Sequence, residues 1–218
     1  MRSWVLGKIP AVSAAALMLA SCGPKQLALP SDPIDRAATC AVVSAADSRA
    51  KAPEAKGDLD FDAQTRIIHY AMIAGSEGNN FSAKRASAVV NRMGEVEADI
   101  TNGKWQDLVA PCDQAYPVVK KTDGIALPKG RFDAELGCYS MGDFLVKTVT
   151  TSDPTAQERF AAFQKMKRQL DGPIGSALKA RGAGSYVKTQ ALKEAALVQM
   201  TKLGAPAEVM KICTSRFS

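Results

Sequence analysis

Residues 103–117, GKWQDLVAPCDQAYP, recur in altered form as residues 204–218, GAPAEVMKICTSRFS. In each segment a glycine stands nine residues before a cysteine, an acidic residue precedes two apolar residues, and an aromatic residue follows the cysteine by four positions. Such self-similarity, in a fixed order along the chain, is the sequence signature of a repeated structural unit. The two segments therefore predict two copies of one module.

A second pair of segments supports the duplication. Residues 62–73, DAQTRIIHYAMI, align with residues 155–166, TAQERFAAFQKM. Alanine, glutamine and arginine coincide, and the apolar residues Ile67, Tyr70 and Ile73 match apolar residues of the second segment. The alternative is a chance match, because short coincidences arise easily in an alanine-rich helical sequence.

The apolar residues recur at the three- and four-residue spacing of amphipathic helices. The clearest stripe is Ala86, Val89, Val90, Met93, Val96 and Ile100. No run alternates as a strand would. We therefore predict an all-α fold made of two related, disulfide-stapled four-helix modules packed into one helical domain. Module 1 covers residues 32–116, a linker covers 117–131, and module 2 covers 132–218.

Several helix ends are predicted from local signals. Asp32 and Pro33 are typical of an N-cap and a first-turn proline. Ser82 is a further N-cap, and Gly75 is the expected C′ glycine of a helix that starts near Asp62. In module 2 we expect a helix from Asp153–Pro154 to Asp171, and a glycine-rich insertion with at most one short helix in residues 172–184.

The start of the chain has the layout of a secretory signal peptide. Arg2 and Lys8 precede the apolar run IPAVSAAALMLA, residues 9–20, which is too short to span a bilayer permanently. The four residues from Leu19 to Cys22, which begin at the end of this run, resemble the lipobox of bacterial lipoproteins. The resemblance implies that residues 1–21 are removed, that Cys22 is lipidated, and that residues 22–31 are a tether. It implies an envelope protein facing the periplasm, with the outer membrane favoured. Ordinary signal cleavage, with Cys22 a spare thiol, is the alternative.

Lipidation of Cys22 leaves four cysteines, an even number in an oxidising compartment. Four cysteines allow three pairings, and the repeat selects one of them. It joins the early and the late cysteine of each module, Cys40 with Cys112 and Cys138 with Cys213. With no CxxC pair and a single histidine, we expect no metal site and no cofactor.

The charge is moderate. Removing Arg2 and Lys8 with the signal peptide lowers the formal net charge from +6 to +4. The basic residues are scattered, which argues against nucleic-acid binding but leaves contact with anionic lipid or wall polymers open.

Few residues are candidates for chemistry. The sequence lacks a G-x-S-x-G or an H-E-x-x-H motif, and we expect the single histidine, His69, to be partly exposed and structural. Glu95, Glu97 and Asp99 are interpreted as a solvated helix face. The candidate binding residues are His69, Arg66 and Arg159, since the two arginines occupy matching positions of the repeat.

These observations predict a non-catalytic binding module tethered to a membrane through acylated Cys22. Its partner is an envelope protein, peptidoglycan or lipid. An envelope hydrolase using His69 or an acidic pair is one alternative, and it requires a cleft where His69 meets a carboxylate or hydroxyl. An inhibitor or immunity lipoprotein, acting through a protruding loop such as residues 75–80 or 181–185, is the other. A binding module requires an exposed apolar patch or groove at the module junction.

Overall fold

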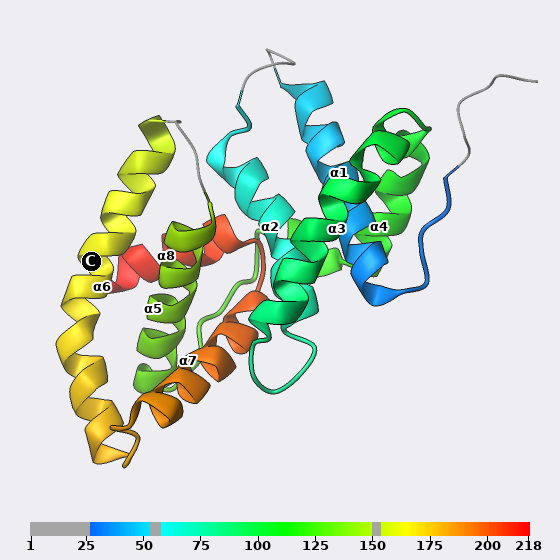
Figure 1. Cartoon of the computed structure of the whole chain (residues 1–218). Coiled ribbons are helices and arrows are strands. Elements are labelled where there is room, and N and C mark those ends of the chain that lie inside the picture. Colours follow the sequence, from blue (N-terminus) through cyan, green and yellow to red (C-terminus); the bar gives the residue numbers. More distant parts are fainter. Residues whose placement is uncertain (1–26, 53–57, 150–153) are drawn as a thin grey trace, which may run out of the picture.

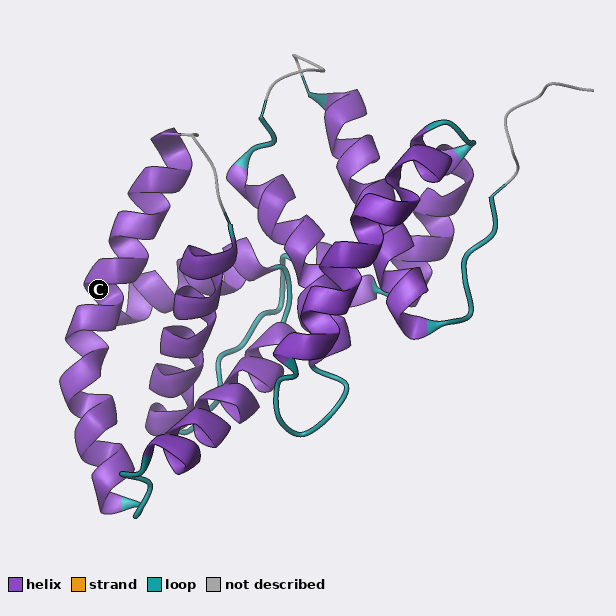
Figure 2. Ribbon diagram, viewed as in Figure 1, coloured by secondary structure: helices purple, strands orange, loops and turns teal. Residues whose placement is uncertain are grey.

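The computed structural model describes residues 27–52, 58–149 and 154–218, and within them every regular element is helical (Figures 1 and 2). The all-α prediction is confirmed. Cys22 and the whole of the predicted signal peptide lie outside the described residues. None of the described helices is long and apolar enough to cross a membrane.

Module 1 is built on its first helix. Helix α1 (Pro33–Lys51) packs against α2 (Phe61–Gly75), α3 (Ala83–Thr101) and the paired short helices η1 (Trp105–Leu108) and α4 (Val109–Ala115). Its small residues Ala37, Ala38 and Ala41 are fully buried, which lets the other helices approach its backbone closely. The Cys40–Cys112 disulfide, with a sequence separation of 72, ties the first helix to the last.

Module 2 repeats this plan. Helix α5 (Arg131–Thr148) packs against α6 (Pro154–Ala180), α7 (Tyr186–Thr201) and α8 (Pro206–Phe217). The Cys138–Cys213 disulfide has a sequence separation of 75. Both disulfides are the pairs that the repeat predicts. The repetition is incomplete, because α2 packs along α3 whereas its counterpart α6 packs on α8.

The helix starts follow the predicted capping chemistry. The carboxylate of Asp32 accepts hydrogen bonds from the main-chain N–H groups of Ile34 and Asp35, and Asp60 caps α2 in the same way through Ala63. The hydroxyl of Ser82 accepts from the N–H of Arg85 at 3.3 Å. These side chains satisfy N–H groups that a helix leaves unpaired at its first turn.

Helix α6 contradicts the predicted end at Asp171. It continues through Pro173 as a single helix of 27 residues, so residues 172–180 are not an insertion. The reason is packing, because Leu170, Ile174 and Leu178 extend one apolar stripe, at a spacing of four residues, into the core. Burying these side chains outweighs the cost of a proline inside a helix.

Gly75 is also not the C′ glycine that was predicted. It is the last residue of α2, and its φ angle is not positive. A Cβ atom there would lie 2.7 Å from the ring of Phe81, so the residue is small because the returning chain packs against it. The sequence signal was correct about a helix end and wrong about its cause.

The linker between the modules carries a short helix, η2 (Pro117–Lys120), and then runs along the junction. The main-chain oxygen of Lys121 accepts a hydrogen bond from the N–H of Ala205, just before α8, at 2.8 Å. Ile125 packs closely on Gly204, the glycine of the second repeat segment. The linker is therefore part of the contact between the modules.

Candidate functional site

The junction between the modules is centred on α2. This helix packs within module 1 against α1 and α3, and it also contacts η2 and the module 2 helices α7 and α8 (Figure 1). A helix packed on several sides is buried around most of its surface. Two of the three candidate binding residues, Arg66 and His69, lie on α2, so the junction determines what each can do.

His69 lies in the core of the junction. Its side chain is 0% exposed, and its Nε2 lies 2.8 Å from the main-chain oxygen of Thr201 in α7. Because a carbonyl oxygen only accepts, Nε2 carries the proton and donates it. The other ring nitrogen, Nδ1, is buried without a hydrogen-bond partner. Burial lowers the pKa of His69 to about 4, against the opposing effect of the Thr201 hydrogen bond, so the ring is neutral at pH 7.

The expectation that His69 is partly exposed is wrong, for a physical reason. The pattern of apolar residues in 62–73 places His69 at the edge of the helix face that packs in module 1. In an isolated module 1, the neighbouring face of this helix would meet solvent. Module 2 covers that second face with α7. The prediction failed because it treated α2 as the surface helix of one module.

Arg159 joins the modules through an ion pair. Its Nη1 lies 2.6 Å from Oδ1 of Asp62, and its guanidinium lies 5.0 Å from the centre of the Phe61 ring. Phe61 in turn contacts Phe160 edge-on at 5.5 Å and Phe163 at 6.1 Å. The matching start segments of α2 and α6 therefore dock on one another. This position gives Arg159 a role in the junction.

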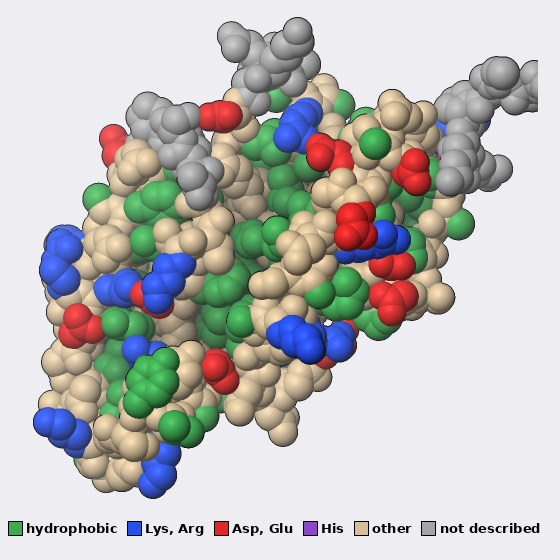
Figure 3. All heavy atoms as spheres, in the orientation of Figure 1, with side chains coloured by type: hydrophobic (Ala, Val, Ile, Leu, Met, Phe, Trp, Pro, Cys, Tyr) green, Lys and Arg blue, Asp and Glu red, His purple; other side chains and the backbone are tan. Residues whose placement is uncertain are grey.

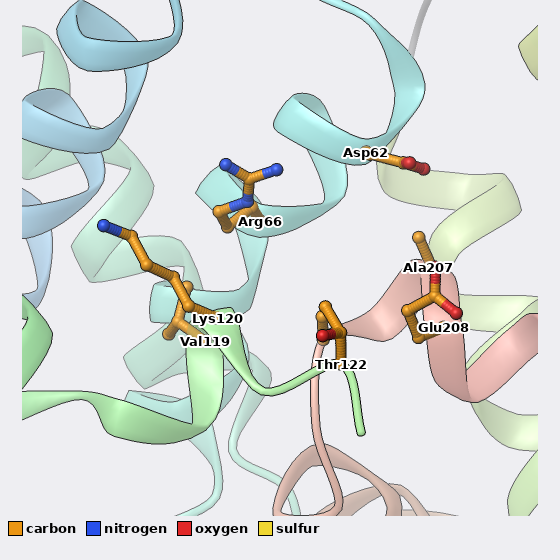
Figure 4. A pocket seen from close by; sticks show the side chains of 8 residues that line it. Asp62, Arg66, Val119, Lys120, Thr122, Ala207 and Glu208 are labelled. Carbon is orange, nitrogen blue, oxygen red and sulfur yellow. The ribbon is translucent and has the colours of Figure 1, made fainter. Parts of the chain in front are cut away.

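Arg66 lines a pocket of about 230 Å³ beside the start of α8, shown in Figure 4. The two basic side chains, Arg66 and Lys120, lie on one side of it, and the two acidic ones, Asp62 and Glu208, lie on the other. Lys120 is paired with Asp113 at 2.7 Å. Since charges of both signs line its wall, the pocket is not specific for a ligand of one charge sign.

A larger groove lies elsewhere at the junction, between α2 and α3 on one side and α5 and α7 on the other. Its apolar half has a volume of about 280 Å³ and no charged side chain in its wall. That half is lined by Ile68, Ala71, Phe81, Ala83, Ala86, Ser87, Val90, Asn91, Phe144 and Thr148. The wall is built from both modules, so the groove exists only where they meet.

The polar half of the groove has a volume of about 510 Å³. It shares Phe81, Ala83, Phe144 and Thr148 with the apolar half, so the two halves form one continuous groove. Its other lining residues are Tyr139, Ser140, Asp143, Lys147, Tyr186, Gln190, Lys193, Glu194 and Leu197. We refer to these two sets together as the junction groove.

Two of the three exposed large apolar side chains line this groove. Val90, Tyr186 and Val187 are the large apolar residues that stand out as exposed in the described part of the chain, at 45%, 82% and 76%. Val90 and Tyr186 line the groove, and Val187 follows Tyr186. Figure 3 shows apolar side chains collected in the hollow between the two halves of the molecule. Contiguous exposed apolar surface is typical of binding sites.

Charged groups surround Tyr139 at the polar end. The ammonium groups of Lys193 and Lys167 lie 4.7 Å and 5.2 Å from the centre of its ring. Lys167 and Lys147 both pair with Asp143. Burial, followed by the charge of Asp171, raises the pKa of Tyr139 to about 12, so its phenol is neutral at pH 7. The polar end therefore holds cations on a neutral aromatic ring.

The residues of the junction groove could not be identified from sequence motifs. Its walls come from four helices of two modules, and no motif links them. One signal was present, because Val89 and Val90 are adjacent and cannot both face one core. Val89 is fully buried, whereas Val90 faces the groove.

One residue of the predicted acidic helix face, Glu95, forms an ion pair with Arg92 at 2.7 Å. No cluster of metal-binding side chains occurs among residues 27–52, 58–149 and 154–218.

Comparison of the chain with protein-family models, with curated proteins and with solved structures finds no match. The geometry of the junction is therefore the basis for inferring function.

Proposed function

We propose that this protein is a lipid-anchored component of a bacterial cell envelope that works by binding, without catalysis, in the junction groove. One observation carries the proposal. Two of the three exposed large apolar side chains of the described residues, Val90 and Tyr186, line a groove that the two modules form together. Apolar surface left exposed costs solubility, so its concentration at one concave site is best explained by a ligand or partner that covers it.

The environment of His69 favours this function over the hydrolase alternative. A general base needs access to the substrate proton and an orienting partner. His69 is fully buried, and the hydrogen bond of its Nε2 goes to a main-chain oxygen. Its position supports a role in holding α2 against α7.

One observation favours the inhibitor alternative as a second candidate. The loop between α2 and α3 extends from the body of the protein (Figure 1), and Glu77 to Asn80 are exposed. Its base is fixed, because the N–H of Ser82 donates to the main-chain oxygen of Gly75 at 2.8 Å and Arg85 pairs with Glu77. A rigid exposed loop of this kind could enter the active site of an enzyme.

The anchor is tested by membrane fractionation of cells that express the Cys22→Ser variant. The expected result is release of the protein into the soluble periplasmic fraction with its disulfides intact. Retention in the membrane fraction would contradict lipidation at Cys22. Because Cys22 is not one of the disulfide cysteines, the fold should not change.

The groove is tested with the neutral apolar dye Nile red. The purified protein should bind the dye, and Val90→Asp should weaken binding about tenfold, because a carboxylate in the apolar half is costly to desolvate. Ala98→Asp is the matched control, since Ala98 is exposed on the same helix and does not line the groove. Equal binding by both variants would contradict the proposal.

A further inference from the structure

We infer that the ligand of the junction groove is a single-chain amphiphile with a monoanionic carboxylate head, that is, a fatty-acid-like molecule. This inference rests on the proposed function and specifies its ligand. It follows from three features of the groove: its shape and volume, the uneven distribution of charge along it, and the state of one lysine.

The volume fits a small amphiphile. The two halves measure about 280 Å³ and about 510 Å³, which lies within the range of small-molecule sites. The apolar half carries alanine, valine, isoleucine and phenylalanine side chains, with Ser87, Asn91 and Thr148 as its polar residues. None of them is charged, so this half suits a hydrocarbon chain.

The charges lie at one end only. Asp143, Lys147, Lys193 and Glu194 line the polar half, and no charged side chain lines the apolar half. An amphipathic helix carries polar groups along its whole length. A ligand with one polar head and one apolar tail matches a groove with one polar end better than a helix does.

The ammonium group of Lys193 favours a ligand whose head group is negatively charged. Within the described residues Lys147 and Lys167 share the single carboxylate of Asp143, whereas no ion pair of Lys193 is present there. The Lys193 ammonium lies instead over the Tyr139 ring at 4.7 Å. Of the two lysines that line this half of the groove, Lys193 is therefore the one whose ammonium is available to an anionic head. A phosphate head carries about −1.5 to −2 at pH 7, which is more than the ammonium of Lys193 neutralises by itself.

Two neighbouring groups complete the polar end. The hydroxyl of Ser140 is buried and has no hydrogen-bond partner, and Ser140 lines this half of the groove. Glu194 follows Lys193 and accepts a hydrogen bond from Gln190 at 3.1 Å. Its negative charge repels an anionic head. Removing the charge of Glu194 should therefore strengthen the binding of an anionic probe, whereas removing the charge of Lys193 should weaken it.

The experiment compares three probes with the same tail: dodecanoate, dodecyl phosphate and dodecanol. Binding to the purified Cys22→Ser protein from the soluble periplasmic fraction is measured by isothermal titration. Dodecanoate should bind about tenfold tighter than dodecanol, because a charge-assisted hydrogen bond to Lys193 adds to the burial of the tail. Dodecyl phosphate should bind no tighter than dodecanoate.

Substitutions locate the two ends of the ligand. Lys193→Gln should reduce the affinity for dodecanoate to that for dodecanol, whereas Lys188→Gln, at an exposed lysine of the same helix that does not line the groove, should have no effect. Glu194→Gln should tighten dodecanoate binding. Ser87→Trp should weaken all three probes about tenfold by filling the apolar half, and Ala98→Trp should not.

Several results would overturn the inference: equal binding of dodecanoate and dodecanol, no binding of any probe, or binding insensitive to Ser87→Trp or to Lys193→Gln. Its failure differs from failure of the proposed function. If Nile red binds in a Val90-dependent manner and dodecanoate does not bind, the groove remains a binding site and its ligand is of another class.

Discussion

The Nε2 atom of His69 lies 2.8 Å from the main-chain oxygen of Thr201, and this hydrogen bond joins the two modules inside their shared core. His69 is thus a neutral structural group held away from water. The consequences for stability, for the junction and for the groove can be measured separately.

The first prediction is a loss of stability in mild acid. Burial lowers the pKa of His69 in the folded protein from 6.5 to about 4, so the unfolded chain binds a proton that the folded chain excludes over this range. Stability therefore falls as the pH drops from about 6.5 to about 4, by about 3 kcal/mol from this residue.

Urea denaturation at several pH values measures this effect. His69→Gln keeps an N–H donor for Thr201 but does not titrate. Its free energy of unfolding should fall less than that of the wild type between pH 7 and pH 4, with the carboxylates contributing equally to both proteins. Parallel curves for the two proteins would contradict the assigned role of His69.

The two disulfides should contribute equally. Their sequence separations of 72 and 75 close loops of similar length, and the chain-entropy model assigns about 4 kcal/mol to each. Replacing Cys40 and Cys112 by alanine, or Cys138 and Cys213 by alanine, should lower the free energy of unfolding by similar amounts, as measured by chemical denaturation. A loss confined to one pair would mean that the modules are not equivalent units.

The junction should depend on apolar contacts more than on its ion pair. Asp62 and Arg159 are each nearly half exposed, so Asp62→Asn should cost less than about 1 kcal/mol. Phe61 is 1% exposed and packs on two further phenylalanines, so Phe61→Ala should cost about 3–5 kcal/mol. Thermal unfolding of both variants tests this order, and a reversed order would contradict it.

A further prediction concerns the proline inside α6. Pro173 is exposed and lacks the N–H that a helix interior uses, so Pro173→Ala should stabilise the protein by about 1–2 kcal/mol. Chemical denaturation provides the measurement, with Ala180→Pro at the last residue of α6 for comparison. A destabilised Pro173→Ala protein would show that the proline is matched to a local bend in the helix.

The sequence predicts those structural features that depend on single residues or on the internal repeat. Capping by Asp32 and Ser82 follows from side chains that bond their own helix starts, so single residues were sufficient. The disulfide pairing followed because each module repeats the order of its cysteines. Both kinds of inference need no knowledge of how the modules meet.

The junction could not be predicted in this way. The burial of His69 and the continuation of α6 past Asp171 both depend on packing against other helices, which overrides local propensity. The junction groove depends on the same packing, since Val90 and Tyr186 become neighbours of one hollow only when the modules are docked.

The central claim, that the junction groove is the binding surface of the protein, is tested most directly by photo-crosslinking in intact envelopes. A photoreactive amino acid is placed at Val90, in the apolar half of the groove, or at Ala98, exposed on the same helix outside it. The account predicts a discrete crosslinked product from position 90, whether lipid or protein, that is absent from position 98 and is lost when Ser87→Trp fills the groove. Identical products from both positions, or a product that persists in the Ser87→Trp protein, would contradict it.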